Sequence, residues 1–160
     1  MAEKIAKVLV VGLGNTYRSD DAVGLIVAEK LKGRVGGNVE VVEHGGEPID
    51  LLQLWEGYQK VILVDAVTGG KSPGTIHRFD VHQDPIPAGI IHFSTHQMSL
   101  PATIELARTL EKLPQFLLVF GVEAGSFSAG ISISPEVKRA SEILINQITS
   151  ELNALQSTDS

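Results

Sequence analysis

Two segments of this chain place acidic residues where carboxylates can do chemistry. Asp20 and Asp21 follow a glycine turn at 12–15 and stand at the predicted start of a helix. Asp65 interrupts the apolar run 61–67, where burying a carboxylate is costly unless a hydrogen-bond donor, a cation or a metal lies beside it. Carboxylates that lie close together can share a proton and activate water, or they can ligate a metal ion.

Each acid also has an ordinary structural interpretation. Asp20 and Asp21 could simply interact with the positive end of the helix dipole, as acids in a first helical turn often do. Asp65 could cap the loop that follows its strand. The residue types alone leave both alternatives open.

An imidazole beside such acids would extend the chemistry. His96 stands among polar residues just before a predicted helix, in a segment that could fold over a crevice. Two carboxylates and one imidazole make a site suited to nickel or zinc with coordination positions left open. Among the remaining histidines, His77 and His82 are expected to be exposed around a strand, and His92 is expected to be structural or at the surface. His44 lies in a glycine turn at a strand end.

The elements that must position these residues alternate between strand and helix. We expect strands over 5–11, 39–43, 60–67, 75–81 and 116–122, and helices over 20–32, 49–55, 101–113 and from 135 to the end of an apolar stripe at Leu155. This order predicts an α/β fold, a single-domain three-layer α/β/α structure with a mostly parallel five-stranded twisted sheet. Because the connection before 75–81 is too short for a helical crossover, that strand is predicted to pair antiparallel at an edge.

The predicted topology brings three strand ends together. The first three strands end on the same side of a parallel sheet, so we expect Asp21, His44 and Asp65 near one crevice, where open α/β sheets place their sites. Ser19 is the expected N-cap of the first helix and Gly33 its stop. We expect one domain over 1–155 and a frayed tail over 156–160.

Composition limits the classes of partner. The chain has 160 residues, of which 43% are apolar, and a net charge of −6, which disfavours nucleic acid and anionic membranes because both attract clustered Lys and Arg. No stretch is long and apolar enough to span a bilayer. The absence of cysteine excludes disulfides, thiolate metal sites and a cysteine nucleophile, and it favours a cytoplasmic location.

A nucleotide-binding module is an alternative from another class. The dinucleotide fingerprint G-x-G-x-x-G requires a third glycine, but Tyr17 occupies that place after Gly12 and Gly14. Two carboxylates at the helix start would also repel a pyrophosphate. Glu43 at the end of the second strand resembles a ribose-binding acid and keeps the alternative open.

The motifs together resemble those of a known family, the hydrogenase maturation endopeptidases, over nearly the whole chain. The shared features are Gly12-Leu13-Gly14-Asn15 with Asp20-Asp21 and Gly24, Asp65-Ala66, His96-Gln97, Gly121-Val122-Glu123, and the segment Gly130 to Pro135. The resemblance implies an endopeptidase, of aspartic type, that removes the C-terminal extension of a nickel–iron hydrogenase large-subunit precursor after nickel insertion. The precursor is then the protein partner.

The resemblance also implies roles for individual residues. Asp21 and Asp65 would be catalytic, and together with His96 they would bind a metal. That metal is the nickel already present in the substrate precursor, and no permanently bound catalytic metal is expected. Asn15 and the loop His44-Gly45-Gly46 are expected to bind substrate.

Two departures from the family pattern concern this site. Many members have Glu where this chain has Asp21, and an Asp-Gly-Gly-Thr step where it has His44-Gly45-Gly46-Glu47. Two mechanisms stay open: a carboxylate pair that activates water, or a substrate nickel that polarises the scissile carbonyl or a water. A non-enzymatic alternative is a metal-binding chaperone that holds the precursor without cutting it.

Overall fold

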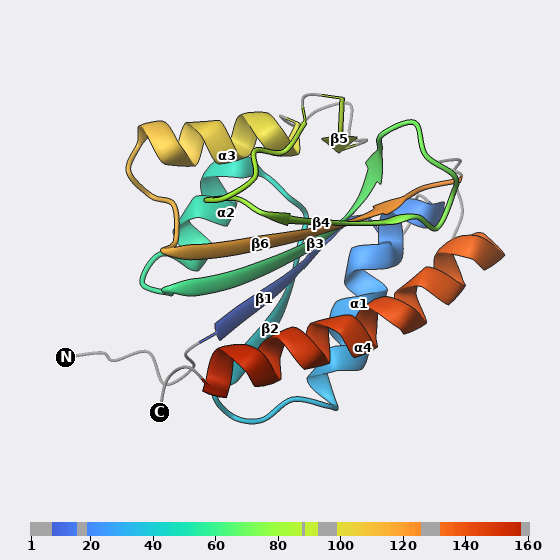
Figure 1. Cartoon of the computed structure of the whole chain (residues 1–160), viewed down its shortest axis with the longest axis horizontal. Helices are drawn as coiled ribbons and strands as arrows, with labels where there is room; N and C mark the ends of the chain where they lie inside the picture. The colour runs from blue at the N-terminus through green and yellow to red at the C-terminus, as the bar shows by residue number, and fades with distance from the viewer. Residues whose placement is uncertain (1–7, 16–18, 88, 93–98, 126–131, 158–160) are drawn as a thin grey trace.

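The computed structural model describes residues 8–15, 19–87, 89–92, 99–125 and 132–157. Within these residues strands and helices follow one another along the chain, except that β3, β4 and β5 are consecutive strands (Figure 1). The strands are β1 (Val8–Leu13), β2 (Val39–His44), β3 (Lys60–Thr68), β4 (Ile76–Asp80), β5 (Ile91–His92) and β6 (Phe116–Glu123). The helices are η1 (Ser19–Ala22, a 3-10 helix), α1 (Val23–Lys32), α2 (Pro48–Trp55), α3 (Leu100–Thr109) and α4 (Pro135–Ser157).

The sheet is mixed and mostly parallel. Its main path runs β2-β1-β3-β6-β4, and β5 pairs with β3 beside this path. The pairs β1–β2, β1–β3 and β3–β6 are parallel, whereas β4 lies antiparallel to β6 at the edge. The predicted fold, including its antiparallel edge strand, is therefore confirmed. The two-residue strand β5, antiparallel to the end of β3, was not predicted.

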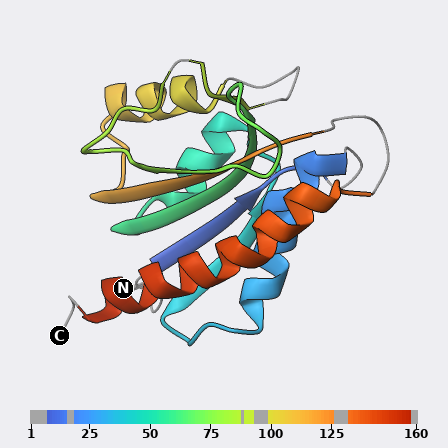
Figure 2. The same cartoon turned by 45° about the vertical axis from the view of Figure 1, so that its right-hand side comes forward.

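Helices cover both faces of the sheet, as Figures 1 and 2 show: α2 and α3 lie on one face and α1 and α4 on the other. Alternate residues of each strand face opposite cores. In β1, Val8 and Val10 pack beneath α1 and α4, while Leu9, Val11 and Leu13 pack beneath α2 and α3. Because both faces are covered, the central strands read as continuous apolar runs.

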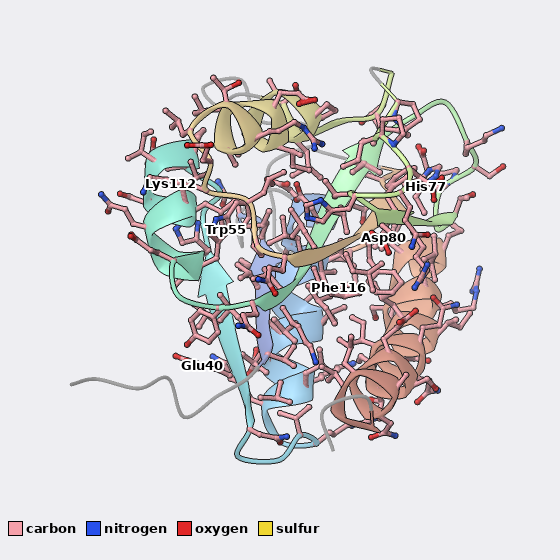
Figure 3. The ribbon with its side chains drawn as sticks, turned by 60° about the vertical axis from the view of Figure 1, so that its left-hand side comes forward. Glu40, Trp55, His77, Asp80, Lys112 and Phe116 are labelled. Carbon is pink, nitrogen blue, oxygen red and sulfur yellow. The ribbon has the colours of Figure 1, made fainter. Side chains whose placement is uncertain are left out.

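Buried side chains of α2 and α4 hold these helices in place. Trp55 at the end of α2 is 1% exposed and donates its Nε1–H to the carbonyl of Lys112 at 2.8 Å, and Figure 3 labels both residues. The predicted stripe of α4 is buried at Val137, Ala140, Leu144, Ile148 and Leu152, and Leu155 is partly buried. The apolar stripe packs α4 on the sheet by burying apolar area, and the hydrogen bond joins α2 to the segment that follows α3.

The start of the first helix differs from the prediction. Asp20 and Asp21 lie in η1, and α1 begins only at Val23, with Ala22 as an N-cap that makes no side-chain capping bond. The prediction of Ser19 as N-cap is wrong. Ser19 has a φ of 47°, which is left-handed, whereas an N-cap residue normally has extended backbone.

Glycines allow α1 to touch the sheet backbone directly. A Cβ on Gly12 would lie 2.1 Å from the carbonyl oxygen of Gly24. A Cβ on Gly24 would lie 2.2 Å from the carbonyl oxygen of Leu13 and 2.5 Å from that of Val64. These distances are far below van der Waals contact, so no side chain fits at either position. The first turn of α1 therefore lies against both β1 and β3.

We expect Gly24→Ala to destabilise the fold because the added methyl group collides with backbone atoms that cannot rotate away. The free energy of unfolding should fall by at least about 2 kcal/mol, measured by urea denaturation. Gly33→Ala is the matched control, since nothing lies within 4 Å of a Cβ there; its change should stay within about 1 kcal/mol. Equal stabilities for the two variants would contradict the direct backbone contact.

Candidate active site

The carboxyl ends of β1 and β3 meet η1, and two buried acids lie at this junction. Asp21 in η1 is 2% exposed, and Asp65 in β3 is 1% exposed. Gly24 stands three residues after Asp21 in the chain. It contacts the carbonyl of Val64, which is the residue before Asp65. The structure therefore brings the elements that carry Asp21 and Asp65 into direct contact.

The loop after β1 links this junction to β2. The amide of Asn15 donates to the carbonyl of Asp21 at 3.1 Å, and the amide of Gly14 donates to the carbonyl of His44 at 3.2 Å. A Cβ on Gly14 would lie 2.1 Å from the carbonyl oxygen of Asp21, so this approach also requires glycine. Asn15 is exposed, which leaves its side chain accessible at the rim of the junction.

His44 is held in one ring orientation by its own loop. The amide of Gly46 donates to Nδ1 of His44 at 2.8 Å. Because Nδ1 accepts this bond, the neutral imidazole carries its proton on Nε2. Burial lowers the pKa of His44, and the negative charges of Asp50 and Glu47 oppose this effect only in part. The loop thus favours a neutral imidazole with an Nε2–H donor.

The third predicted metal ligand, His96, lies outside the described residues, and the three-residue ligand set stays a prediction. Within the described part of the chain, no group of three histidines or acids is arranged to hold a metal ion. The strand-end topology brings the Asp21, His44 and Asp65 elements to one end of the sheet, as the parallel pairings of β1 with β2 and β3 require.

Besides Asp21 and Asp65, this end of the sheet holds a further buried acid, Glu123, for which no role was predicted. Glu123 at the end of β6 is 2% exposed; it accepts from the amide of Gly69 at 2.9 Å and contacts Nε2 of His77 at 2.7 Å. The side chain of His77, labelled in Figure 3, is only 15% exposed, so its prediction as an exposed residue is wrong. Two signals were available for Glu123: it ends an apolar strand, and it belongs to the shared Gly121-Val122-Glu123 motif.

Gly121 sits between these two groups. It pairs with Asp65 of β3 on one side and with His77 of β4 on the other. Residues level with each other in adjacent strands point to the same face of a sheet. Asp65 and the His77–Glu123 pair therefore occupy one face, separated by a residue that has no side chain.

The acid that kept the nucleotide alternative open has another partner. Glu43 at the end of β2 forms an ion pair with Lys32 of α1 at 3.0 Å. Both side chains are more than 40% exposed, so this is a surface contact of small energetic value. This ion pair explains the acid at position 43 without a bound nucleotide.

Comparison with known proteins identifies the class. The family model described as hydrogenase maturation protease matches residues 25–151. The chain therefore belongs to the hydrogenase maturation protease family, which is a family of peptidases. This agrees with the resemblance seen in the sequence motifs.

Individual relatives support this assignment. The hydrogenase 2 maturation protease of Escherichia coli K12 is 27% identical over 150 residues, which cover 91% of this chain and 90% of that protein. The hydrogenase expression/formation protein HupD of Thiocapsa roseopersicina is 29% identical over 135 residues. That match covers 82% of this chain and 61% of HupD, so the chain spans less than two thirds of this relative's length.

A solved structure shows the same fold. The hydrogenase maturating endopeptidase HybD from E. coli superposes with a TM-score of 0.79 at 26% identity, covering 92% of this chain and 93% of that chain.

Among the helices described for this chain, none is both long enough and apolar enough to cross a membrane.

The state of His44 generates a prediction about pH. Since its pKa is lowered in the folded protein, the unfolded chain binds a proton at His44 more readily than the folded protein does. The stability that neutral His44 contributes is therefore present above its ordinary pKa of 6.5 and is lost as the pH falls from that value through the lower pKa of the folded protein. We expect the free energy of unfolding to fall more steeply in the unaltered protein than in His44→Asn between about pH 7.5 and 5.5.

Urea denaturation at several pH values measures this difference. The other histidines contribute equally to both proteins, so they cancel in the comparison. Parallel pH profiles would contradict the assignment of a neutral, Nδ1-accepting His44.

Proposed function

We propose that this protein is an endopeptidase that removes the C-terminal extension of a nickel–iron hydrogenase large-subunit precursor after nickel has been inserted. The observation that carries the proposal is the pair of buried acids, Asp21 and Asp65, on contacting elements at the carboxyl end of the sheet. Membership of the hydrogenase maturation protease family supports the substrate class.

In this proposal Asp21 and Asp65 are the catalytic acids. Two carboxylates on contacting elements can share a proton and activate water, and they can also ligate a metal that a substrate carries. Together with His96, which lies outside the described residues, they would contact the nickel of the precursor. Carboxylate and imidazole ligands suit nickel, and no resident catalytic metal is required.

The two possible mechanisms differ in whether cleavage depends on nickel having been inserted into the precursor. If the substrate's nickel polarises the scissile carbonyl or a water, only a precursor with a completed site is cut. A carboxylate pair that activates water by itself would not distinguish loaded from empty precursor. We favour the first mechanism because it makes cleavage a check on nickel insertion.

Asn15, His44, Gly45 and Gly46 form the proposed substrate-binding rim. Asn15 and Gly45 are exposed, and the bond from Gly46 to Nδ1 of His44 leaves Nε2–H available as a donor. A neutral donor suits a backbone carbonyl or another acceptor of the precursor. The cysteine-free composition supports a cytoplasmic location, where thiols stay reduced.

The proposed function is tested by incubating the purified protein with nickel-loaded and nickel-free large-subunit precursor and measuring masses. Release of a C-terminal peptide from the loaded precursor alone is the expected result. Release from both forms would keep the peptidase and favour the carboxylate-pair mechanism. Binding without release would favour a chaperone, and no binding would refute the proposed substrate.

Replacing either acid with its amide should stop the reaction. We expect Asp21→Asn and Asp65→Asn each to lower the cleavage rate by at least about 100-fold, because an amide neither takes up a proton nor carries the charge that a metal requires. Asp84→Asn is the matched control, since Asp84 is an exposed aspartate, and it should cleave at the unaltered rate. Full activity of either site variant would remove that acid from the mechanism.

His96→Ala tests metal recognition separately. If His96 contacts the precursor's nickel, this variant should process loaded precursor more slowly and discriminate less between loaded and empty forms. Complete processing with undiminished discrimination would exclude the metal-recognition role of His96.

A further inference from the structure

Asp20 and Asp21 are neighbours in sequence, but the fold gives them different surroundings. Asp20 is 0% exposed and lies in η1, the short helix that carries Asp21. Its Oδ1 accepts from the amide of Ser134 at 2.7 Å. Its Oδ2 accepts from the amide of Gly125 at 2.7 Å and from the hydroxyl of Ser134. Asp20 is therefore engaged by donors from a distant part of the chain.

These donors join η1 to two other elements. Gly125 is the second residue after β6, and Ser134 directly precedes α4. The bonds connect residues that are 105 and 114 positions apart. A Cβ on Gly125 would lie 3.2 Å from Cβ of Pro73. The connection that follows β3 therefore packs on the same cluster, and β3 carries Asp65.

The backbone of η1 depends on such support. Ser19, the residue before Asp20, has a φ of 47°, a conformation that L-residues avoid unless the surrounding structure imposes it. The carbonyl of Asp21 then accepts from Asn15 at 3.1 Å. Asp20 on one side and Asn15 on the other thus hold the peptide that carries Asp21.

We propose that Asp20 is a positioning residue for Asp21: its carboxylate holds η1 against Gly125 and Ser134, so that the Asp21 carboxylate is presented at the carboxyl end of β3. This inference rests on the proposed function, because it concerns the same site. All three donors point at a group that only accepts, which is the property of an ionised carboxylate.

Asparagine cannot replace Asp20 in this role. Whichever way its amide turns, the NH2 group faces either the amide N–H of Ser134 or that of Gly125. One donor then opposes another, and η1 must shift. Ser134→Ala is a milder change, since it removes the hydroxyl bond and keeps the amide bond, and Ser134→Thr retains a hydroxyl.

The test measures kcat and KM for peptide release from nickel-loaded precursor. We expect Asp20→Asn to lower kcat by at least about tenfold, because small displacements of catalytic groups have effects of this size or larger, and to change KM by less than about threefold. Ser134→Ala should lower kcat less than Asp20→Asn does. Ser134→Thr, which keeps a hydroxyl, should have a kcat close to that of the unaltered protein. Asp84→Asn is the control for loss of one aspartate charge.

Two further readouts separate positioning from a purely structural role. The double variant Asp20→Asn with Ser134→Ala should be no slower than Asp20→Asn alone, because both changes break the same contact. Amide hydrogen exchange should speed up at Asp21 and Ala22 in Asp20→Asn and stay unchanged in Asp84→Asn.

Each outcome decides a stated point. If the unaltered protein releases peptide and folded Asp20→Asn has an unaltered kcat, the positioning role is wrong while the proposed function stands. If Ser134→Ala and Ser134→Thr are equally slow, the hydroxyl contact is not the cause and the inference is also wrong. If the unaltered protein releases nothing, the proposed function fails and the inference fails with it.

Discussion

The direct contact between the backbone of α1 and the backbones of β1 and β3 is the constraint on which the site depends. Gly12 and Gly24 allow an approach that any side chain would prevent. Gly24 follows Asp21 by three positions and contacts Val64, the residue before Asp65. This one contact therefore sets the distance between η1, which carries Asp21, and β3, which carries Asp65. A longer separation would leave a parallel sheet intact but would take η1 away from β3.

Asp20 and Asp21 are adjacent aspartates, but the fold gives their side chains different surroundings. Asp20 accepts hydrogen bonds from the segments that flank the β6–α4 connection, whereas Asp21 lies in the same turn beside β3. A carboxylate that accepts several hydrogen bonds is a strong anchor, because hydrogen bonds to a charged acceptor are stronger than neutral ones. In the proposed function, consecutive positions of one 3-10 turn therefore have different roles: Asp20 anchors the turn, and Asp21 takes part in the reaction.

The carboxyl end of the sheet holds another buried acidic side chain, Glu123, besides the two proposed catalytic acids. Glu123 accepts from Gly69 and contacts His77, and its backbone carbonyl also accepts from the amide of Gly74 at 2.8 Å. These bonds fix the β3–β4 connection beside Asp65. Buried polar groups of this kind give the site a single geometry, because each must keep its partners to offset the cost of leaving water.

The sequence by itself determined the order of elements, the parallel sheet with its antiparallel edge, and the apolar stripes that face the two cores, because these depend on local periodicity and connection length. It also pointed to Asp65, since an acid in an apolar strand is conspicuous. Only the tertiary structure decided the partners of Asp20 and Glu123 and the left-handed backbone of Ser19. Those features depend on contacts between residues that are far apart in the chain, about which local pattern and propensity carry no information.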